Sequence, residues 1–180
     1  QDLTFKPRFF SNNEFLLQSE YRKVNKNSSH ILDFSLNKTN SDSDKGRNTH
    51  FFSNSKFDLD TTLFSESSLE LKIEKVSNDD YISLYSLEST SPIIKDTSVL
   101  ENVIEFSGSQ DGFYLDLSFE SYETMNKPTS DKYEFVYPNY SLKKIKFFEE
   151  KLINNFEFIS SGNQKKHSTN VYEAVQVNDF

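Results

Sequence analysis

Residues 113–122 read Phe-Tyr-Leu-Asp-Leu-Ser-Phe-Glu-Ser-Tyr, and this stretch decides the fold class. Phe113, Leu115, Leu117 and Phe119 occupy alternate positions, and Asp116 and Glu120 fall between them. Successive side chains of a β-strand point to opposite faces, so a period of two predicts a strand with one apolar and one polar face.

The same period recurs along most of the chain. In residues 68–76, Leu69, Leu71 and Ile73 alternate with Glu70, Lys72 and Glu74. The alternating segments are residues 3–10, 15–24, 30–36, 51–59, 68–76, 99–107, 113–122, 133–148, 155–161 and 171–180. Short turns, one of them predicted at residues 108–112, and longer connections at 37–49, 79–97 and 126–132 separate them. We therefore predict an all-β fold, an antiparallel up-and-down β-meander of about ten strands.

Composition supports strands over helices and over disorder. The chain has eighteen Phe and nine Tyr, although only 34% of its residues are hydrophobic. Aromatic residues favour strands and bury much area, whereas disordered segments are depleted in them. The single Ala, Ala174, also disfavours helices.

Charge and cysteine content exclude several classes of function. The formal net charge is -8, and no concentrated basic surface is evident, so nucleic acid is not expected as a partner. With no Cys, the chain can form neither a disulfide framework nor a thiolate metal site. His30, His50 and His167 are well separated, and we predict no metal or cofactor site.

The carboxylates do not predict an enzyme. Glu70 and Glu74, or Asp116 and Glu120, are four residues apart, which on a strand means roughly 13 Å at ~3.3 Å per residue. That separation is too large for a paired general acid and base, although cross-strand pairing could bring other carboxylates together. We expect no catalytic residue.

Alternation alone is compatible with two architectures. A soluble β-sandwich and a transmembrane β-barrel both have one apolar and one polar face per strand. Two features favour the barrel: whole strands carry charge on their polar side, and short turns alternate with long loops. If loops 37–49 and 79–97 are the long ones, we expect them at the same rim, with the short turns near 25–29 and 60–64 at the other.

Several short signatures resemble the family of the lipopolysaccharide-assembly protein LptD, formerly called organic solvent tolerance protein. Asp2-Leu3-Thr4-Phe5-Lys6-Pro7-Arg8-Phe9 is similar to its strand of the form D-L-T-x-x-P-R-aromatic, and Leu17-Gln18-Ser19-Glu20-Tyr21-Arg22 to the strand that follows. Residues 73–81 resemble its passage x-x-x-V-S-D-x-D-Y, and residues 133–142, with Val136-Tyr137-Pro138, a later strand. The similarity runs in order over nearly the whole chain.

The resemblance implies one part of a larger protein, in the outer membrane of a Gram-negative bacterium. The chain opens on Gln1-Asp2-Leu3 and ends on Asn178-Asp179-Phe180 without a turn, so we expect residues 1–180 to be a cut segment. It would be the N-terminal part of the barrel, without the periplasmic jelly-roll domain and the first strands. Its role would be a wall segment in lipopolysaccharide transport and insertion into the outer leaflet, and hence in membrane biogenesis.

The same resemblance implies partners and places the residues. The barrel surrounds a lipoprotein plug, LptE, and carries lipopolysaccharide, while periplasmic bridge proteins contact the jelly-roll domain. The lumen-facing candidates are Glu70, Lys72, Glu74, Asp116 and Glu120. The candidates facing outer-membrane lipid are Leu69, Leu71, Ile73, Phe113, Leu115, Leu117 and Phe119. The alternative is a soluble antiparallel β-sandwich that acts as an extracellular binding module and needs no detergent.

Overall fold

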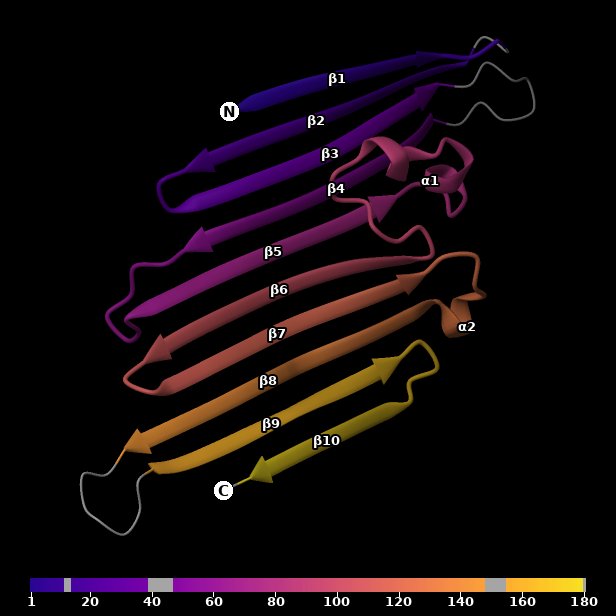
Figure 1. The fold of residues 1–180 in the computed structure, drawn as a ribbon. Helices are drawn as coiled ribbons and strands as arrows, with labels where there is room; N and C mark the ends of the chain where they lie inside the picture. Colours follow the sequence, from indigo (N-terminus) through magenta and orange to yellow (C-terminus); the bar gives the residue numbers. More distant parts are fainter. Residues whose placement is uncertain (12–13, 39–46, 148–154, 180) are drawn as a thin grey trace.

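The ten predicted strands form a single antiparallel sheet in the computed structural model, which describes residues 1–11, 14–38, 47–147 and 155–179. Each strand pairs with its neighbour in sequence, in the order β1 to β10 (Figure 1). The strands are β1 (Asp2–Phe9), β2 (Phe15–Asn25), β3 (Ser28–Lys38), β4 (Arg47–Asp58), β5 (Glu66–Val76), β6 (Val99–Gln110), β7 (Phe113–Thr124), β8 (Tyr133–Phe147), β9 (Asn155–His167) and β10 (Tyr172–Asp179). The all-β, up-and-down meander is confirmed.

The turn between β6 and β7 is shorter than predicted. Asp111 and Gly112 both have positive φ, 46° and 73°, which is the backbone of a type I′ hairpin turn. Gly108 belongs to β6 instead of the turn, and a Cβ at this position would lie 2.8 Å from the Phe64 ring. This glycine provides room for an aromatic side chain, which a sequence pattern cannot distinguish from turn chemistry.

The connections between consecutive strands lie alternately at two opposite rims of the sheet (Figure 1). The connections after β1, β3, β5, β7 and β9 share one rim, called here the insertion rim, and those after β2, β4, β6 and β8 share the other, the turn rim. Loop 79–97 is therefore at the same rim as the connection between β3 and β4, as predicted. Part of the predicted loop 37–49 belongs to β3 and β4, and residues 39–46 lie outside the described residues.

Residues 77–98, called here the insertion, form the ordered connection between β5 and β6. They contain α1 (Tyr81–Leu84) and η1 (Leu87–Thr90), and a further short helix, α2 (Thr129–Lys132), lies between β7 and β8. Four buried side chains of the insertion pack against the sheet, in a cluster of Leu16, Phe52, Tyr81, Ile82, Leu87, Ile94, Leu100 and Met125. The main hydrophobic core therefore lies beneath the insertion, at one rim.

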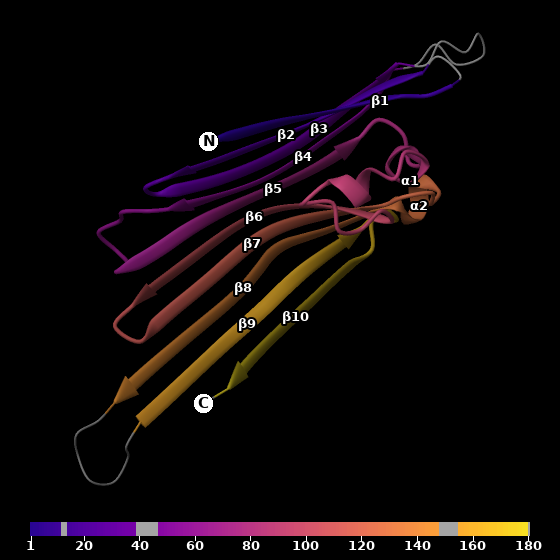
Figure 2. The same ribbon diagram turned by 45° about the horizontal axis from the view of Figure 1, so that its top comes forward.

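The sheet is open, and Figure 2 shows it as a twisted surface bounded by β1 and β10. Directly after β1, the amide of Phe10 donates to the Glu14 carbonyl across the hairpin at 3.1 Å. Backbone amides alternate in direction along a strand, so the amide of Arg8 also faces β2, and the backbone nitrogen of Pro7 faces the open edge. The missing N–H of proline thus falls where no described strand needs it.

Candidate functional site

The predicted polar and apolar sets lie on opposite faces of the sheet. Directly paired residues share a face, and the register pairs Lys72 with Val103 and Val103 with Glu120. On the other face, Leu71 pairs with Ile104 and Ile104 with Phe119. Glu70, Glu74 and Asp116 share the first, polar face, and Leu69, Ile73, Phe113, Leu115 and Leu117 share the second, apolar face.

The apolar face is largely uncovered. Phe5 of β1 is 58% exposed, and Ile104 of β6 and Phe119 of β7 are 53% and 48% exposed, so the exposed residues extend over much of the sheet. Polar side chains, in contrast, are buried beneath the insertion: Gln18, Asp33 and His50 are at most 2% exposed. This distribution is the reverse of a soluble sheet, whose apolar face is its interior.

Acidic residues cross three strands of the polar face. Glu70 of β5 and Glu105 of β6 are directly opposite each other, and Asp116 and Glu120 of β7 lie on either side of Ser118, which pairs with Glu105. Like charges at directly opposite positions are unfavourable, and Lys56 of β4, directly opposite Glu70, supplies an opposite charge. Glu105 is an acidic residue of this face that the sequence prediction did not include. No group of His, Asp and Glu in the described part of the chain is arranged to hold a metal ion.

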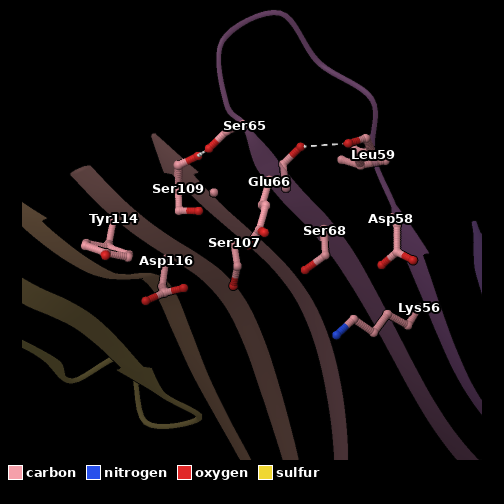
Figure 3. A pocket seen from close by; sticks show the side chains of 12 residues that line it. Lys56, Asp58, Leu59, Ser65, Glu66, Ser68, Ser107, Ser109, Tyr114 and Asp116 are labelled. Carbon is pink, nitrogen blue, oxygen red and sulfur yellow. Dashed lines mark hydrogen bonds between the residues drawn. The ribbon is translucent and has the colours of Figure 1, made fainter. Parts of the chain in front are cut away.

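A hydroxyl-rich hollow opens on the polar face near the turn rim (Figure 3). Its volume is about 530 Å³, and Lys56, Asp58 and Asp116 lie around it. Its remaining lining is mostly serine: Ser65, Ser67, Ser68, Ser107 and Ser109. Such a surface offers many hydrogen-bond donors and acceptors, which suits water or a polar ligand.

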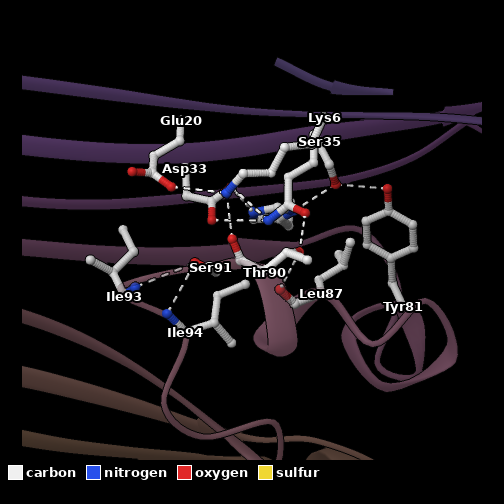
Figure 4. A network of polar contacts seen from close by, with 12 residues as sticks. Lys6, Glu20, Asp33, Ser35, Tyr81, Leu87, Thr90, Ser91, Ile93 and Ile94 are labelled. Carbon is white, nitrogen blue, oxygen red and sulfur yellow. Dashed lines mark hydrogen bonds and ion pairs between the residues drawn. The ribbon is translucent and has the colours of Figure 1, made fainter. Parts of the chain in front are cut away.

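A buried hydrogen-bonded network joins the insertion to β2, β3 and β4 (Figure 4). Asp33 accepts from Gln18 Nε2 at 3.1 Å, and its Oδ1 lies 3.1 Å from His50 Nε2. His50 Nδ1 is 2.6 Å from Ser35 Oγ, which is 2.8 Å from the Tyr81 hydroxyl. Donation in one direction, from Tyr81 through Ser35 and His50 to Asp33, satisfies every atom of the chain.

The Asp-His-Ser order of this network resembles a hydrolase triad, but the network is buried, whereas a triad has to be accessible to substrate. Asp33 is fully buried, Ser35 and His50 are each 2% exposed, and Tyr81 covers Ser35. A nucleophile must be within reach of a substrate, and Ser35, at 2% exposure, is not. Burial raises the pKa of Tyr81 to about 12, so its hydroxyl stays protonated and can donate to Ser35. The arrangement fixes Tyr81 of the insertion to β3 and β4.

Two cations of β1 extend the network toward η1. Lys6 Nζ lies 3.0 Å from Glu20 and also donates to the Thr90 carbonyl. Arg8 donates to the Tyr85 carbonyl at 2.6 Å and to the Thr90 hydroxyl at 2.6 Å. Figure 4 shows Lys6 between Glu20 and Thr90. The insertion is thus held by strands that precede it by more than forty residues.

A second attachment joins the insertion to the connection between β7 and β8. Asp79 accepts from the Asn126 amide at 2.8 Å and from Lys132 Nζ at 3.0 Å. The Asn126 hydrogen bond, with the nearby Lys132 ammonium, lowers the pKa of Asp79 below its usual range. The hydrogen bonds to Asp79 and Glu123 raise the pKa of Lys132.

This attachment is expected to loosen in acid. Because the pKa of Asp79 is lower in the folded state than in the unfolded chain, its contribution is complete above the usual pKa, about 3.9. The contribution is lost as the pH falls below that value and through the folded pKa. Hydrogen exchange of the Asn126 amide should therefore accelerate below about pH 4 beyond its intrinsic pH dependence. Asp79→Asn should remove the additional acid-dependent acceleration, and its persistence in that variant would assign it to another group.

The comparisons with known proteins add no identification. No protein-family model, curated protein or solved structure matches the chain. Among the described residues, no helix has the length and apolar character needed to cross a membrane. The two faces and the anchored insertion are therefore the features from which a function can be argued.

Proposed function

We propose that the chain is a wall segment of an outer-membrane barrel that transports lipopolysaccharide and inserts it into the outer leaflet. In this proposal the apolar face contacts membrane lipid and the polar face lines the lumen. The proposal combines the resemblance of the short signatures with one structural observation, the reversed distribution of buried polar and exposed apolar side chains.

The apolar face supports this proposal because an exposed sheet face rich in Phe, Leu and Ile is unfavourable in water. Contact with hydrocarbon removes that cost. A soluble sandwich would instead cover the face with a second sheet, and the ten described strands all belong to one sheet. The uncovered face is the observation that favours the membrane wall over the soluble binding module.

The polar face supports a hydrated interior. Glu70, Glu105 and Asp116 would be costly in hydrocarbon but can be solvated in a lumen or contacted by a plug protein. The insertion folds over this face, so in a closed barrel it would occupy part of the lumen at the insertion rim. An LptE-like lipoprotein and the sugar portion of lipopolysaccharide are the proposed luminal partners, with periplasmic bridge proteins acting through a further domain.

Photo-crosslinking from the two faces of β7 tests the proposal. Asp116 and Phe119 are both exposed, lie on opposite faces of the same strand and have side chains outside the buried network. In the full-length protein in cells, a crosslinker at Asp116 should capture the lipoprotein plug or lipopolysaccharide sugar, whereas one at Phe119 should capture lipid. Plug adducts from the crosslinker at Phe119 would contradict the assignment of the faces. So would a crosslinker at Asp116 that captured lipid and neither plug nor sugar.

A further inference from the structure

The sheet contains an internal seam between β5 and β6 at the insertion rim. The β5–β6 ladder runs from Glu66 opposite Ser109 to Lys72 opposite Val103 and ends there. The flanking ladders continue further: β4 pairs with β5 up to Val76, and β6 pairs with β7 from Val99. Residues 73–76 and 99–102 are therefore neighbouring strand ends without a backbone ladder between them.

Side chains replace the missing backbone hydrogen bonds. The Glu74 amide donates to Asn102 Oδ1 at 2.9 Å, and the Glu101 amide donates to Glu74 Oε2 at 2.8 Å. Lys72 Nζ lies 3.1 Å from Glu74 Oε1 and also contacts Glu101. These four residues are called here the clasp. Glu74 is only 6% exposed, so its carboxylate is enclosed by the bonds that it accepts.

The clasp explains a break in the sequence pattern. Asn102 lies on the apolar face, in the position where Leu100, Ile104 and Phe106 predict another apolar residue. Its amide oxygen is needed there as a substitute acceptor for the Glu74 amide. On the same face, a hollow of about 490 Å³ lies over the end of the ladder, lined by Leu71, Ile73, Ile104 and Phe119.

The insertion bridges the two sides of the seam. Its buried side chains contact a cluster with Leu16 and Phe52 from the β1–β5 side and Leu100 and Met125 from the other side. It hydrogen-bonds to Arg8 on the first side and, through Asp79, to Asn126 on the second. Within the described part of the chain, side-chain and insertion contacts therefore take the place of a backbone ladder between the two parts of the sheet at this rim.

We infer that the seam is a built-in opening point: the sheet separates between β5 and β6 from the insertion rim, and the clasp with the insertion keeps it closed. Separation stops at Lys72 and Val103, where the continuous ladder begins. The opening releases the Glu74 and Glu101 amides and residues 77–98 together, since all of them depend on the same contacts. This inference concerns the sheet itself and does not require the proposed function.

Hydrogen exchange of the folded full-length protein, compared with Asn102→Leu, tests the inference. The substitution removes the acceptor of the Glu74 amide while keeping a side chain of similar size on the apolar face. Exchange should accelerate at least about tenfold at the Glu74 and Glu101 amides and within residues 77–98, and stay unchanged at 66–72 and 103–109. Unchanged exchange at the seam, or uniform acceleration over both strands, would overturn the inference.

Asn25→Leu provides the control. Asn25 Nδ2 donates to Ser28 Oγ at 2.9 Å in the β2–β3 turn at the opposite rim, so its loss should leave exchange at the seam as in the wild type. If Asn102→Leu does not fold, Glu74→Gln serves instead, because glutamine keeps an acceptor for the Glu101 amide but loses the ion pair to Lys72. It should accelerate exchange at the seam alone, and acceleration elsewhere would count against the clasp.

Discussion

Replacing Leu117 by Arg is expected to reduce the stability of the membrane-inserted protein by about 2–4 kcal/mol if the residue lies near the bilayer midplane. Leu117 lies within β7 on the apolar face, where it pairs with Phe106 of β6 and Tyr140 of β8. An Arg side chain there would bring a charge into hydrocarbon. The free energy of unfolding, from urea titration of the protein in lipid vesicles, measures the effect.

Asp116→Arg is the control, since Asp116 is the preceding residue on the same strand and its exposed side chain lies on the polar face. Its effect should stay within about 0.5 kcal/mol, as for a surface substitution. Equal costs at the two positions would show that the faces do not differ in environment, and the membrane assignment would then be wrong. The Ser118 position is less suitable, because Ser118 is buried and its hydroxyl donates to Glu120.

Removing the carboxylate of Asp33 is expected to cost roughly 3 kcal/mol. Asp33→Ala leaves two buried donors without an acceptor, Gln18 Nε2 and the His50 ring nitrogen. Each unsatisfied buried donor costs about 1–3 kcal/mol, and neither site is open to water. The same urea titration, followed by circular dichroism, checks the result.

Asp33→Asn separates packing from hydrogen bonding. Asparagine has the same shape and one carbonyl oxygen, so it can accept from either Gln18 or His50 and should recover more than half of the loss. If Asp33→Ala were as stable as the wild type within about 0.5 kcal/mol, the network would contribute nothing and the insertion would be held by its apolar contacts alone.

The strands could be predicted from the sequence because each face of the sheet meets a different environment. In residues 68–76 and 113–122 the alternation is nearly unbroken, and both segments are strands with the predicted division of faces. The ends of the strands were predicted less accurately. The structure extends β9 to His167, whereas the predicted strand ended at Ser161, because Gly162 and the polar residues that follow resemble a loop in sequence. Cross-strand pairing supplies hydrogen bonds that do not depend on side-chain type.

The buried network could not be predicted, because it depends on the location of the insertion. In the sequence, Asp33 and Ser35 show only the alternation of a strand over residues 30–36, and His50 is far from the other histidines. All three are covered by residues 77–98, which have no periodicity that would indicate a docking surface. The break in alternation at Asn102 was a signal for the seam, but only the register shows that the β5–β6 ladder ends beside it.

The order of the strands also determines how the chain can fold. Every ladder joins neighbours in sequence, so each hairpin except β5–β6, whose connection is residues 77–98, closes a short loop at small entropic cost. The β6–β7 hairpin is the most local of them, with a two-residue turn and pairing from Val99–Thr124 to Gln110–Phe113. The Lys6–Thr90 bond, in contrast, spans 84 residues. Docking of the insertion therefore has to follow formation of β1–β4, and until then its apolar side chains are available to a chaperone.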